Sequence, residues 1–408
     1  MAQLVQIFRE KLSVFKILTG KNDDGKTITE STNNFMTNRF GRLNQLLYAR
    51  CPVPSPLALA MQLGWIEEAM YQLANIEVRS LFESTNPTDI PRHFDINQLN
   101  AFRQGGSAPV IWAKSKQQDT RVIGLTWTDE YQSLIALPQS GIQQVKDLRG
   151  RRIGLPKHNV PLDHSRVAAL RGFSVMLETE GLSLKDVEII DLPDHEIPTQ
   201  VRDGQIVSTG TGRRGRYSYS SEIHAISHEL VDAVYVKDVR GAQATHLLGA
   251  QVIANINQYP DPYVRLNNCT PRPLTINSWL LEHYPHLVDC LLLQTHMAGA
   301  WAQDHPLETL ALLSREVGWS ENWIQYAYGN EVHQSLQLDL TAENIKRLSL
   351  YKDFLLQHQF ITQDFSIAHW IDHEPMERLL RKHKPFNRRK PLVLGSKTAG
   401  AKSKGLIH

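Results

Sequence analysis

Short apolar runs alternate with stretches whose apolar residues recur at helical spacing, from residue 46 to about residue 256. Such runs are typical of buried strands, and helical spacing is typical of amphipathic helices that pack on them. The pattern predicts strands at 46–53, 75–83, 108–114, 120–127, 133–138, 187–192, 232–236 and 250–256. It predicts helices at 55–73, 97–105, 164–182 and 221–230, a short helix feeding a strand within 145–156, and helical stretches at 280–306, 307–318 and 342–360.

This alternation predicts an α/β fold with largely parallel sheets. The helical block after residue 280 follows two α/β stretches, which indicates a chain that crosses into a second lobe and then returns. We expect lobe 1 to comprise residues 41–140 and 260–383, and lobe 2 residues 141–259. Hinge strands are expected near 133–138 and 250–256, with a ligand in the cleft between the lobes at the ends of strands.

Three segments fall outside this pattern. Residues 1–40 are interpreted as an N-terminal extension, and residues 384–408 as a basic, flexible tail whose solvated state is favoured over nucleic-acid contact. The stretch STGTGRRGRYSYS, residues 208–220, lacks the terminal GK[ST] of a phosphate loop. We interpret it either as a lid over the cleft or as a plain surface loop.

Composition narrows the class of protein but does not identify the function. The chain has 408 residues, of which 41% are hydrophobic and 21% charged, and its net charge is +2. This balance gives no reason to expect nucleic acid or a membrane as a partner, and no apolar run approaches the ~20 residues of a spanning helix. Three widely spaced cysteines and no recognisable secretory signal favour a cytoplasmic protein, which we expect to be a monomer.

Cys51 stands where the first predicted strand ends, shortly before a helix with Ser55 as its N-cap and Pro56 at its first position. Ligands contact α/β folds at such strand ends, and a helix N-terminus favours a thiolate. An inert buried thiol is the commoner fate of a lone cysteine, so position alone leaves both interpretations open. Cys269 is interpreted as a loop thiol and Cys290 as a core residue.

A second group of polar residues follows further along the chain. His93 can act as a base or as the cationic partner of a thiol, and Gln98 can orient it. Arg103 can hold an oxyanion with its planar fork of donors, while Gly105 and Gly106 allow backbone N–H groups to face an anion. A surface helix closed by glycines explains the same residues. No HExxH motif, paired CxxC motif or other ligand spacing predicts a metal site, and residues 369–375 are interpreted as a solvated face.

Taken together, these motifs resemble the 2'-hydroxybiphenyl-2-sulfinate desulfinase family. The resemblance rests on CPVP at 51–54, followed by His93 with Phe94, then Gln98, Arg103 and the Gly105–Gly106 pair. It extends over roughly residues 45 to 382, through DLRGRRIG, AGAWAQDHP and AHW. The surrounding scaffold is shared with nitrate-, sulfonate- and taurine-type solute-binding proteins and with thiamine-pyrimidine synthase-like proteins.

The resemblance implies a two-lobed type II periplasmic-binding-protein-like fold with extra C-terminal helices. It also implies a cofactor-free reaction that releases sulfite from an organic sulfinate, with Cys51, His93 and Arg103 as catalytic residues and with Phe94 and the two glycines against the substrate. The sequence departs from the family at Ala49 and Ile96, and at a pocket position near Ala168. Two alternatives stay open: a non-catalytic binding protein for a sulfonate-like anion, and a related lyase or hydrolase acting on another acid such as a carboxylate.

Overall fold

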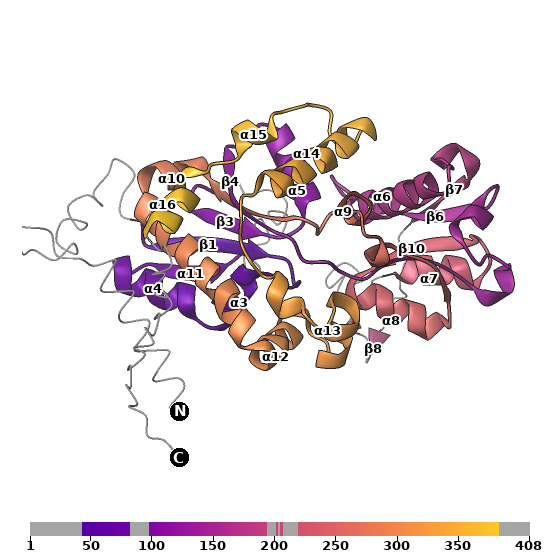
Figure 1. Cartoon of the computed structure of the whole chain (residues 1–408), viewed down its shortest axis with the longest axis horizontal. Coiled ribbons are helices and arrows are strands. Elements are labelled where there is room, and N and C mark those ends of the chain that lie inside the picture. Colours follow the sequence, from indigo (N-terminus) through magenta and orange to yellow (C-terminus); the bar gives the residue numbers. More distant parts are fainter. Residues whose placement is uncertain (1–42, 82–97, 194–200, 203–204, 207–218, 383–408) are drawn as a thin grey trace, which may run out of the picture.

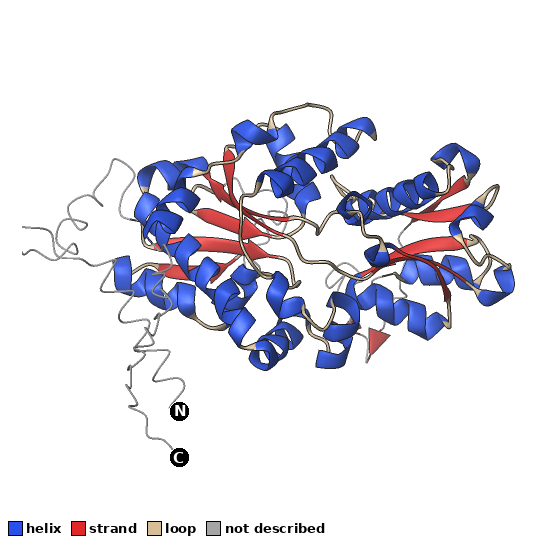
Figure 2. Ribbon diagram, in the orientation of Figure 1, coloured by secondary structure: helices blue, strands red, loops and turns tan. Residues whose placement is uncertain are grey.

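The computed structural model describes residues 43–81, 98–193, 201–202, 205–206 and 219–382, which fold into two α/β lobes (Figures 1 and 2). His93, Phe94 and Ile96 lie outside the described residues, as do the predicted N-terminal extension, the predicted tail and nearly all of the 208–220 loop. None of the described helices is both long and apolar enough to cross a membrane.

The first lobe is built on a five-stranded sheet with the strand order β2-β1-β3-β12-β4. Its strands are β1 (Gln45–Arg50), β2 (Glu77–Ser80), β3 (Ala101–Gln104), β4 (Thr120–Thr126) and β12 (Arg272–Asn277). β1 runs parallel to β2 and β3, whereas β12 is antiparallel to β3 and β4. Every residue of β3 is buried, as expected for a strand in the middle of a sheet that is covered by helices on both faces.

The second lobe is built on another five-stranded sheet, with the order β11-β5-β10-β6-β7. Its strands are β5 (Gln132–Ala136), β6 (Arg152–Lys157), β7 (Glu188–Pro193), β10 (Ala233–Lys237) and β11 (Gln251–Asn255). β6 is parallel to β7 and β10, and β5 is antiparallel to β10 and β11. A separate two-stranded ribbon pairs β8 (Val201–Arg202) with β9 (Gln205–Ile206).

The chain passes between the lobes twice. It leaves the first sheet after β4 and enters the second at β5, and it returns between β11 and β12. The predicted hinge strands at 133–138 and 250–256 are therefore strands of the second sheet, and the two crossings are the adjoining segments 127–131 and 256–271. The expected boundary at 140 falls beyond β5, while that at 260 falls inside the second crossing.

Helices cover both sheets (Figure 1). Those packed in the first lobe include α3 (Pro56–Gln62), α4 (Trp65–Ala74), α5 (Ser107–Ser115), α10 (Ser278–His283), α11 (Pro285–Asp304), α12 (Pro306–Val317), α13 (Glu321–Tyr328), α14 (Ala342–Gln357), α15 (Ile367–Trp370) and α16 (Glu374–Lys382). The second lobe carries α6 (His164–Thr179), α7 (Ser220–Ser227) and α8 (Asp238–Leu248), and α9 (Pro262–Arg265) lies in the second crossing. Single 3-10 turns are found at Pro138–Ser140, Val145–Leu148, Leu184–Asp186, Ile256–Gln258 and Val332–Ser335.

Two local predictions around the glycine pair were wrong. The stretch 97–105, predicted as a helix, contains strand β3, and the stretch 108–114, predicted as a strand, lies within helix α5. A short, continuously apolar run fits a buried helix as well as a buried strand. In this protein the helix is supported by Asn268, about 160 positions further along the chain, which accepts hydrogen bonds from the first N–H groups of α5.

The helix predicted at 55–73 is instead two helices. Gly64 adopts a φ of 69°, a left-handed conformation that favours glycine, and it separates α3 from α4. Ser55 caps α3 as predicted, since its hydroxyl accepts a hydrogen bond from the N–H of Ala58 at 3.1 Å. The first lobe therefore presents a short, capped helix immediately after the end of β1.

Candidate active site

Cys51 follows the last residue of β1 and is partly exposed. Its N–H donates to the carbonyl oxygen of Gln104 at 3.3 Å, which extends the pairing of β1 with β3 by one residue. The side chain of Gln104 also reaches forward, and its Oε1 accepts a hydrogen bond from the N–H of Leu57 in α3 at 3.1 Å. The thiol is thus held between the end of one strand and the start of a helix.

Arg103 lies one strand away, in β3, and is 1% exposed. Its Nη2 lies 3.7 Å from the sulfur of Cys51, and its Nη1 donates to the carbonyl oxygen of Gly106 at 3.1 Å. No carboxylate of the described residues pairs with this guanidinium, and its Nε has no partner among them. A buried cation without a counter-charge is costly, so the site favours an anion.

Gly105 and Gly106 join β3 to α5 and are both buried. A Cβ at position 105 would stand 2.5 Å from the sulfur of Cys51 and 3.0 Å from Nη2 of Arg103, so only a hydrogen atom fits between the two groups. A Cβ at position 106 would meet the side-chain amide of Asn268 at 2.8 Å. No hydrogen-bond acceptor within the described residues is assigned to the N–H of either glycine.

Asn268, in the second crossing, fixes the start of α5. Its carbonyl oxygen accepts the N–H of Ser107 at 2.6 Å, and its Oδ1 accepts the N–H of Ala108 at 2.9 Å. Its neighbour Asn267 donates from Nδ2 to Oε1 of Gln132 and to the hydroxyl of Tyr235, both in the second lobe. This asparagine pair therefore connects the glycine turn of the first lobe to the sheet of the second.

A buried group of charges adjoins Asn268. The carboxylate of Glu130, in the first crossing, accepts hydrogen bonds from Nζ of Lys237 at 2.6 Å and from Nη2 of Arg272 at 3.3 Å. Burial works to lower the pKa of Lys237, but Cys269 and Glu130 raise it well above its usual value. The three charges join the first crossing to the start of β12 in the first lobe and to the end of β10 in the second.

Cys269 belongs to this group, and it lies in a turn, as the prediction of a loop thiol required, but the turn is buried. It is 5% exposed, and Nζ of Lys237 lies 3.5 Å from its sulfur. Burial, reinforced by Glu130, raises the pKa of Cys269 to about 11, so it stays protonated at neutral pH. Cys290 is a core residue as predicted, and burial raises its pKa to about 12.

The structure thus brings together Cys51, Arg103 and the two glycines, which the sequence singled out. Gln98 precedes β3, and its carbonyl oxygen accepts the N–H of Ala101 at 3.2 Å, but the histidine that it was expected to orient lies outside the described residues. Ala49 is fully buried in β1, paired with Arg103. Ala168 is buried in α6, and its carbonyl accepts the amide of Asn267 at 3.1 Å.

Sequence reasoning missed Asn268 and the charged group around Glu130. Both lie in the crossings, far along the chain from Cys51, and neither carries a recognisable motif. The one local signal was the run NNC at 267–269, since two asparagines in a row are unusual in a segment that the fold buries.

Comparisons with known proteins agree with the fold. The family model described as NMT1/THI5 like matches residues 54–236. The curated 2'-hydroxybiphenyl-2-sulfinate desulfinases of Rhodococcus erythropolis and Rhodococcus qingshengii are each 24% identical over 361 residues, covering 83% of this chain and 94% of theirs.

Solved structures show the same relationship. The desulfurization enzyme DSZB superposes with a TM-score of 0.63 at 22% identity, and a cysteine-to-serine mutant of it in complex with biphenyl-2-sulfinic acid with a TM-score of 0.64, each covering 83% of this chain and 99% of that one. The periplasmic aliphatic sulphonate binding protein SsuA of Escherichia coli gives a TM-score of 0.56 at 14% identity, covering 80% of this chain and 97% of that one.

The predicted two-lobed, periplasmic-binding-protein-like fold is therefore confirmed, residues 54–236 match the NMT1/THI5-like family model, and over most of its length the chain is similar to 2'-hydroxybiphenyl-2-sulfinate desulfinase.

Proposed function

We propose that this protein is a desulfinase, which cleaves the carbon–sulfur bond of an aryl sulfinate at Cys51 and releases sulfite. The observation that carries the proposal is the buried guanidinium of Arg103, which has no carboxylate partner among the described residues and lies 3.7 Å from the thiol. The similarity to 2'-hydroxybiphenyl-2-sulfinate desulfinase over 83% of the chain supports it.

Arg103 binds the sulfinate in this proposal. A sulfinate carries one negative charge shared by two oxygens on a pyramidal sulfur, and this pair of acceptors suits the parallel donors of a guanidinium. The N–H groups of Gly105 and Gly106 are two further buried donors on the same turn, so charge that develops on the oxygens meets donors that are already in place. These contacts hold the carbon–sulfur bond next to the thiol.

The balanced reaction is R–SO2⁻ + H2O → R–H + HSO3⁻. In one route the sulfur of Cys51, as a thiolate, attacks the sulfinate sulfur, the aryl carbon takes a proton as its bond to sulfur breaks, and water then releases sulfite and restores the cysteine. In the other, the thiol itself donates the proton to the carbon, and water supplies the oxygen of sulfite and returns a proton to the thiolate. Both routes assign proton transfer to His93.

A second function rests on the same scaffold. The sulphonate binding protein SsuA shares the fold, and a buried arginine suits a binding protein for a sulfonate-like anion as well as it suits an enzyme. Such a role gives no reason for a guanidinium and a thiol 3.7 Å apart with a glycine packed against both, so we favour catalysis.

The test measures sulfite released from benzenesulfinate and from biphenyl-2-sulfinate by the full chain, with binding followed by calorimetry. We expect Cys51→Ser to bind sulfinate without releasing sulfite, and Arg103→Lys to lose most of its affinity because an ammonium cannot reproduce the guanidinium fork. Cys290→Ser, which changes a core thiol remote from Arg103, is the matched control and should keep its activity.

The other outcomes separate the alternatives. Sulfinate binding without turnover in the unmodified chain would indicate a solute-binding protein. Turnover or binding of an aryl carboxylate in place of the sulfinate would indicate a related enzyme for another acid. Full activity in Cys51→Ser would overturn the assignment of the thiol.

A further inference from the structure

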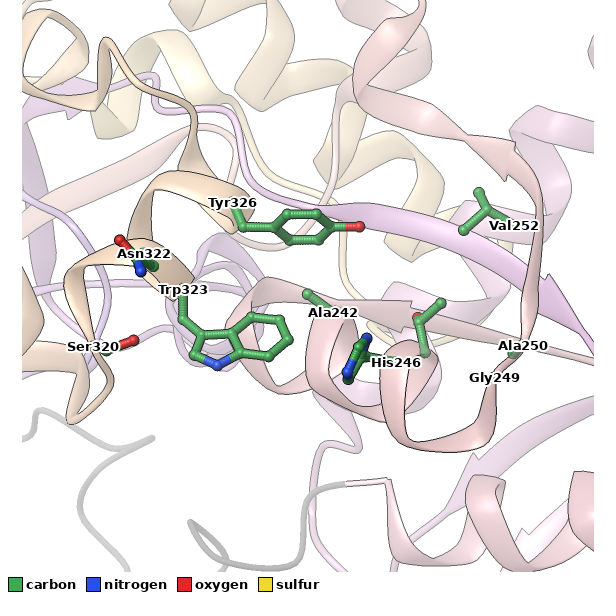
Figure 3. A pocket seen from close by; sticks show the side chains of 10 residues that line it. Ala242, His246, Gly249, Ala250, Val252, Ser320, Asn322, Trp323 and Tyr326 are labelled. Atoms are coloured by element: carbon green, nitrogen blue, oxygen red, sulfur yellow. The ribbon is translucent and has the colours of Figure 1, made fainter.

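A hollow of about 660 Å³ opens between the two lobes on the side of α8 and α13, away from the glycine turn. Figure 3 shows Trp323 and Tyr326 projecting from α13 towards His246 of α8, with Val252 of β11 facing the hydroxyl end of Tyr326. Among the described residues, the lining consists of Ala242, Thr245, His246, Gly249, Ala250, Val252, Ser320, Asn322, Trp323 and Tyr326. Each lobe thus contributes one wall.

Three rings, those of His246, Trp323 and Tyr326, stand in these walls. The ring of Trp323 meets His246 edge-to-face, with centroids 6.1 Å apart, and meets Tyr326 in the same manner at 5.8 Å. Tyr326 is 63% exposed even though it belongs to a helix that packs on the other lobe. Exposed rings that converge on a concave surface are typical of ligand pockets.

The chemistry of the lining selects the class of ligand. None of these ten described residues is a lysine, arginine, aspartate or glutamate, so they offer no counter-charge to a charged ligand. Ser320 and Asn322 stand at one end and supply hydrogen-bonding groups, and the volume is that of pockets that take small organic molecules. We propose that this hollow is a binding site for a neutral, planar aromatic molecule, which bridges the two lobes between α8 and α13.

The walls of the hollow are connected to the first crossing between the lobes. Tyr326 packs against Tyr131 of the first crossing, with ring centroids 5.9 Å apart, and the hydroxyl of Tyr131 is hydrogen-bonded to Thr245 of the pocket wall at 3.0 Å. Residue 131 directly follows Glu130, whose carboxylate joins the first crossing to β12 and β10. A ligand that contacts both walls therefore stabilises the arrangement of the lobes seen here, since it binds that arrangement better than one with the walls apart.

The experiment compares 2-naphthol with its saturated counterpart, decahydro-2-naphthol, by calorimetry on the full chain at neutral pH. Both are neutral alcohols of similar size, and only the first is planar. We expect saturable one-to-one binding of 2-naphthol and no measurable binding of the saturated compound. The Cys51→Ser protein should bind 2-naphthol equally well, so this result stands apart from that of the sulfinate assays.

Variants locate the site. Val252→Trp fills the hollow and should abolish binding of 2-naphthol, whereas Ile189→Trp, on the opposite edge strand of the same sheet, should bind as the unmodified protein does. Tyr326→Ala removes one ring at an exposed position and should weaken binding about tenfold. Equal binding of the planar and saturated alcohols, or unchanged affinity in both Val252→Trp and Tyr326→Ala, would overturn the proposal.

Discussion

At position 105 any side chain larger than a hydrogen atom meets both of the groups that we propose bind and cleave the substrate. The close approach involves side chains, the sulfur of Cys51 and the guanidinium of Arg103, rather than the glycine's own backbone conformation. The glycine is therefore required by the geometry of the site and not by the turn. An added methyl group must displace the thiol, the guanidinium or both.

Gly105→Ala is accordingly expected to lower the rate of sulfite release by about a hundredfold, because a displacement of about 1 Å at a reacting group has an effect of that size. Its thermal unfolding should change much less than that of Gly154→Ala, whose Cβ would crowd Leu192 in the second lobe. Kinetics and melting curves of the two variants provide the comparison. Unchanged turnover in Gly105→Ala would show that the reaction takes place elsewhere.

The residues of this site could be predicted in part. Cys51, Arg103 and the glycines were singled out by their types and positions, but these also fitted an inert thiol and a surface helix closed by glycines. Their assignment to one site came from the family resemblance. Asn268 could not be predicted, because its role depends on a contact across about 160 residues that no local pattern encodes. Cys269 was predicted to be a loop thiol, and the burial of that loop depends in the same way on distant contacts.

At the scale of elements, the start of α5 depends on the second crossing. The first two N–H groups of the helix are bound by Asn268, while the glycine turn before the helix faces Arg103 and Cys51. The sequence predicted most of the longer strands and helices but exchanged the types of β3 and α5. The apolar run after the glycines carries no clear helical period, and the hydrogen bonds that fix the start of α5 come from Asn268, outside the helix.

Asn268→Ala is expected to lower the free energy of unfolding by about 1 kcal/mol, since it removes a side-chain acceptor from the N-terminus of a helix. Asn268→Asp keeps that acceptor and should recover most of the stability. It also places a negative charge beside Gly106, so its KM for the sulfinate should rise while kcat changes little. Equal KM values in the Asp variant and the unmodified protein would contradict an anion site at this turn.

The N-terminus of α6 gives a prediction about pH. Burial works to raise the pKa of its N-cap, Asp163, but hydrogen bonds from His158 and from the N–H of Arg166 lower it to about 2. A carboxyl group with a lowered pKa stabilises the folded state above its usual pKa of 3.8, and that contribution is lost as the pH falls towards 2. Asp163→Asn keeps the cap but does not titrate.

The difference in unfolding free energy between the unmodified protein and Asp163→Asn should therefore be constant near neutral pH and should shrink as the pH falls from about 4 towards 2. Urea unfolding at a series of pH values measures it. A difference that stays the same at every pH would show that Asp163 is not stabilised in its charged form.

At the scale of the whole molecule, the lobes are joined through one buried carboxylate. Glu130 is fully buried and receives Lys237 from the second sheet and Arg272 from the first. The alternation of strands and helices was enough to predict two lobes and a return crossing. The alternation did not show whether the segments at 133–138 and 250–256 were crossings or strands of the second sheet, because β5 and β11 are apolar like the other strands of that sheet.

Glu130→Gln should lower the free energy of unfolding by about 3–5 kcal/mol, because it leaves two buried cations facing a neutral amide. The matched control is Glu77→Gln, which alters an exposed ion pair with Arg79 and should change stability by less than about 1 kcal/mol. Urea unfolding of both variants measures the two changes in the free energy of unfolding. Similar, small effects from the two substitutions would mean that Glu130 does not hold the crossings together.

The most direct test of the whole account is sulfite release from an aryl sulfinate, measured side by side for the unmodified protein and for Cys51→Ser. The account predicts steady release of sulfite by the unmodified protein, no release by Cys51→Ser, and sulfinate binding by both. Absence of sulfite from the unmodified protein, or equal release by the two proteins, would contradict it.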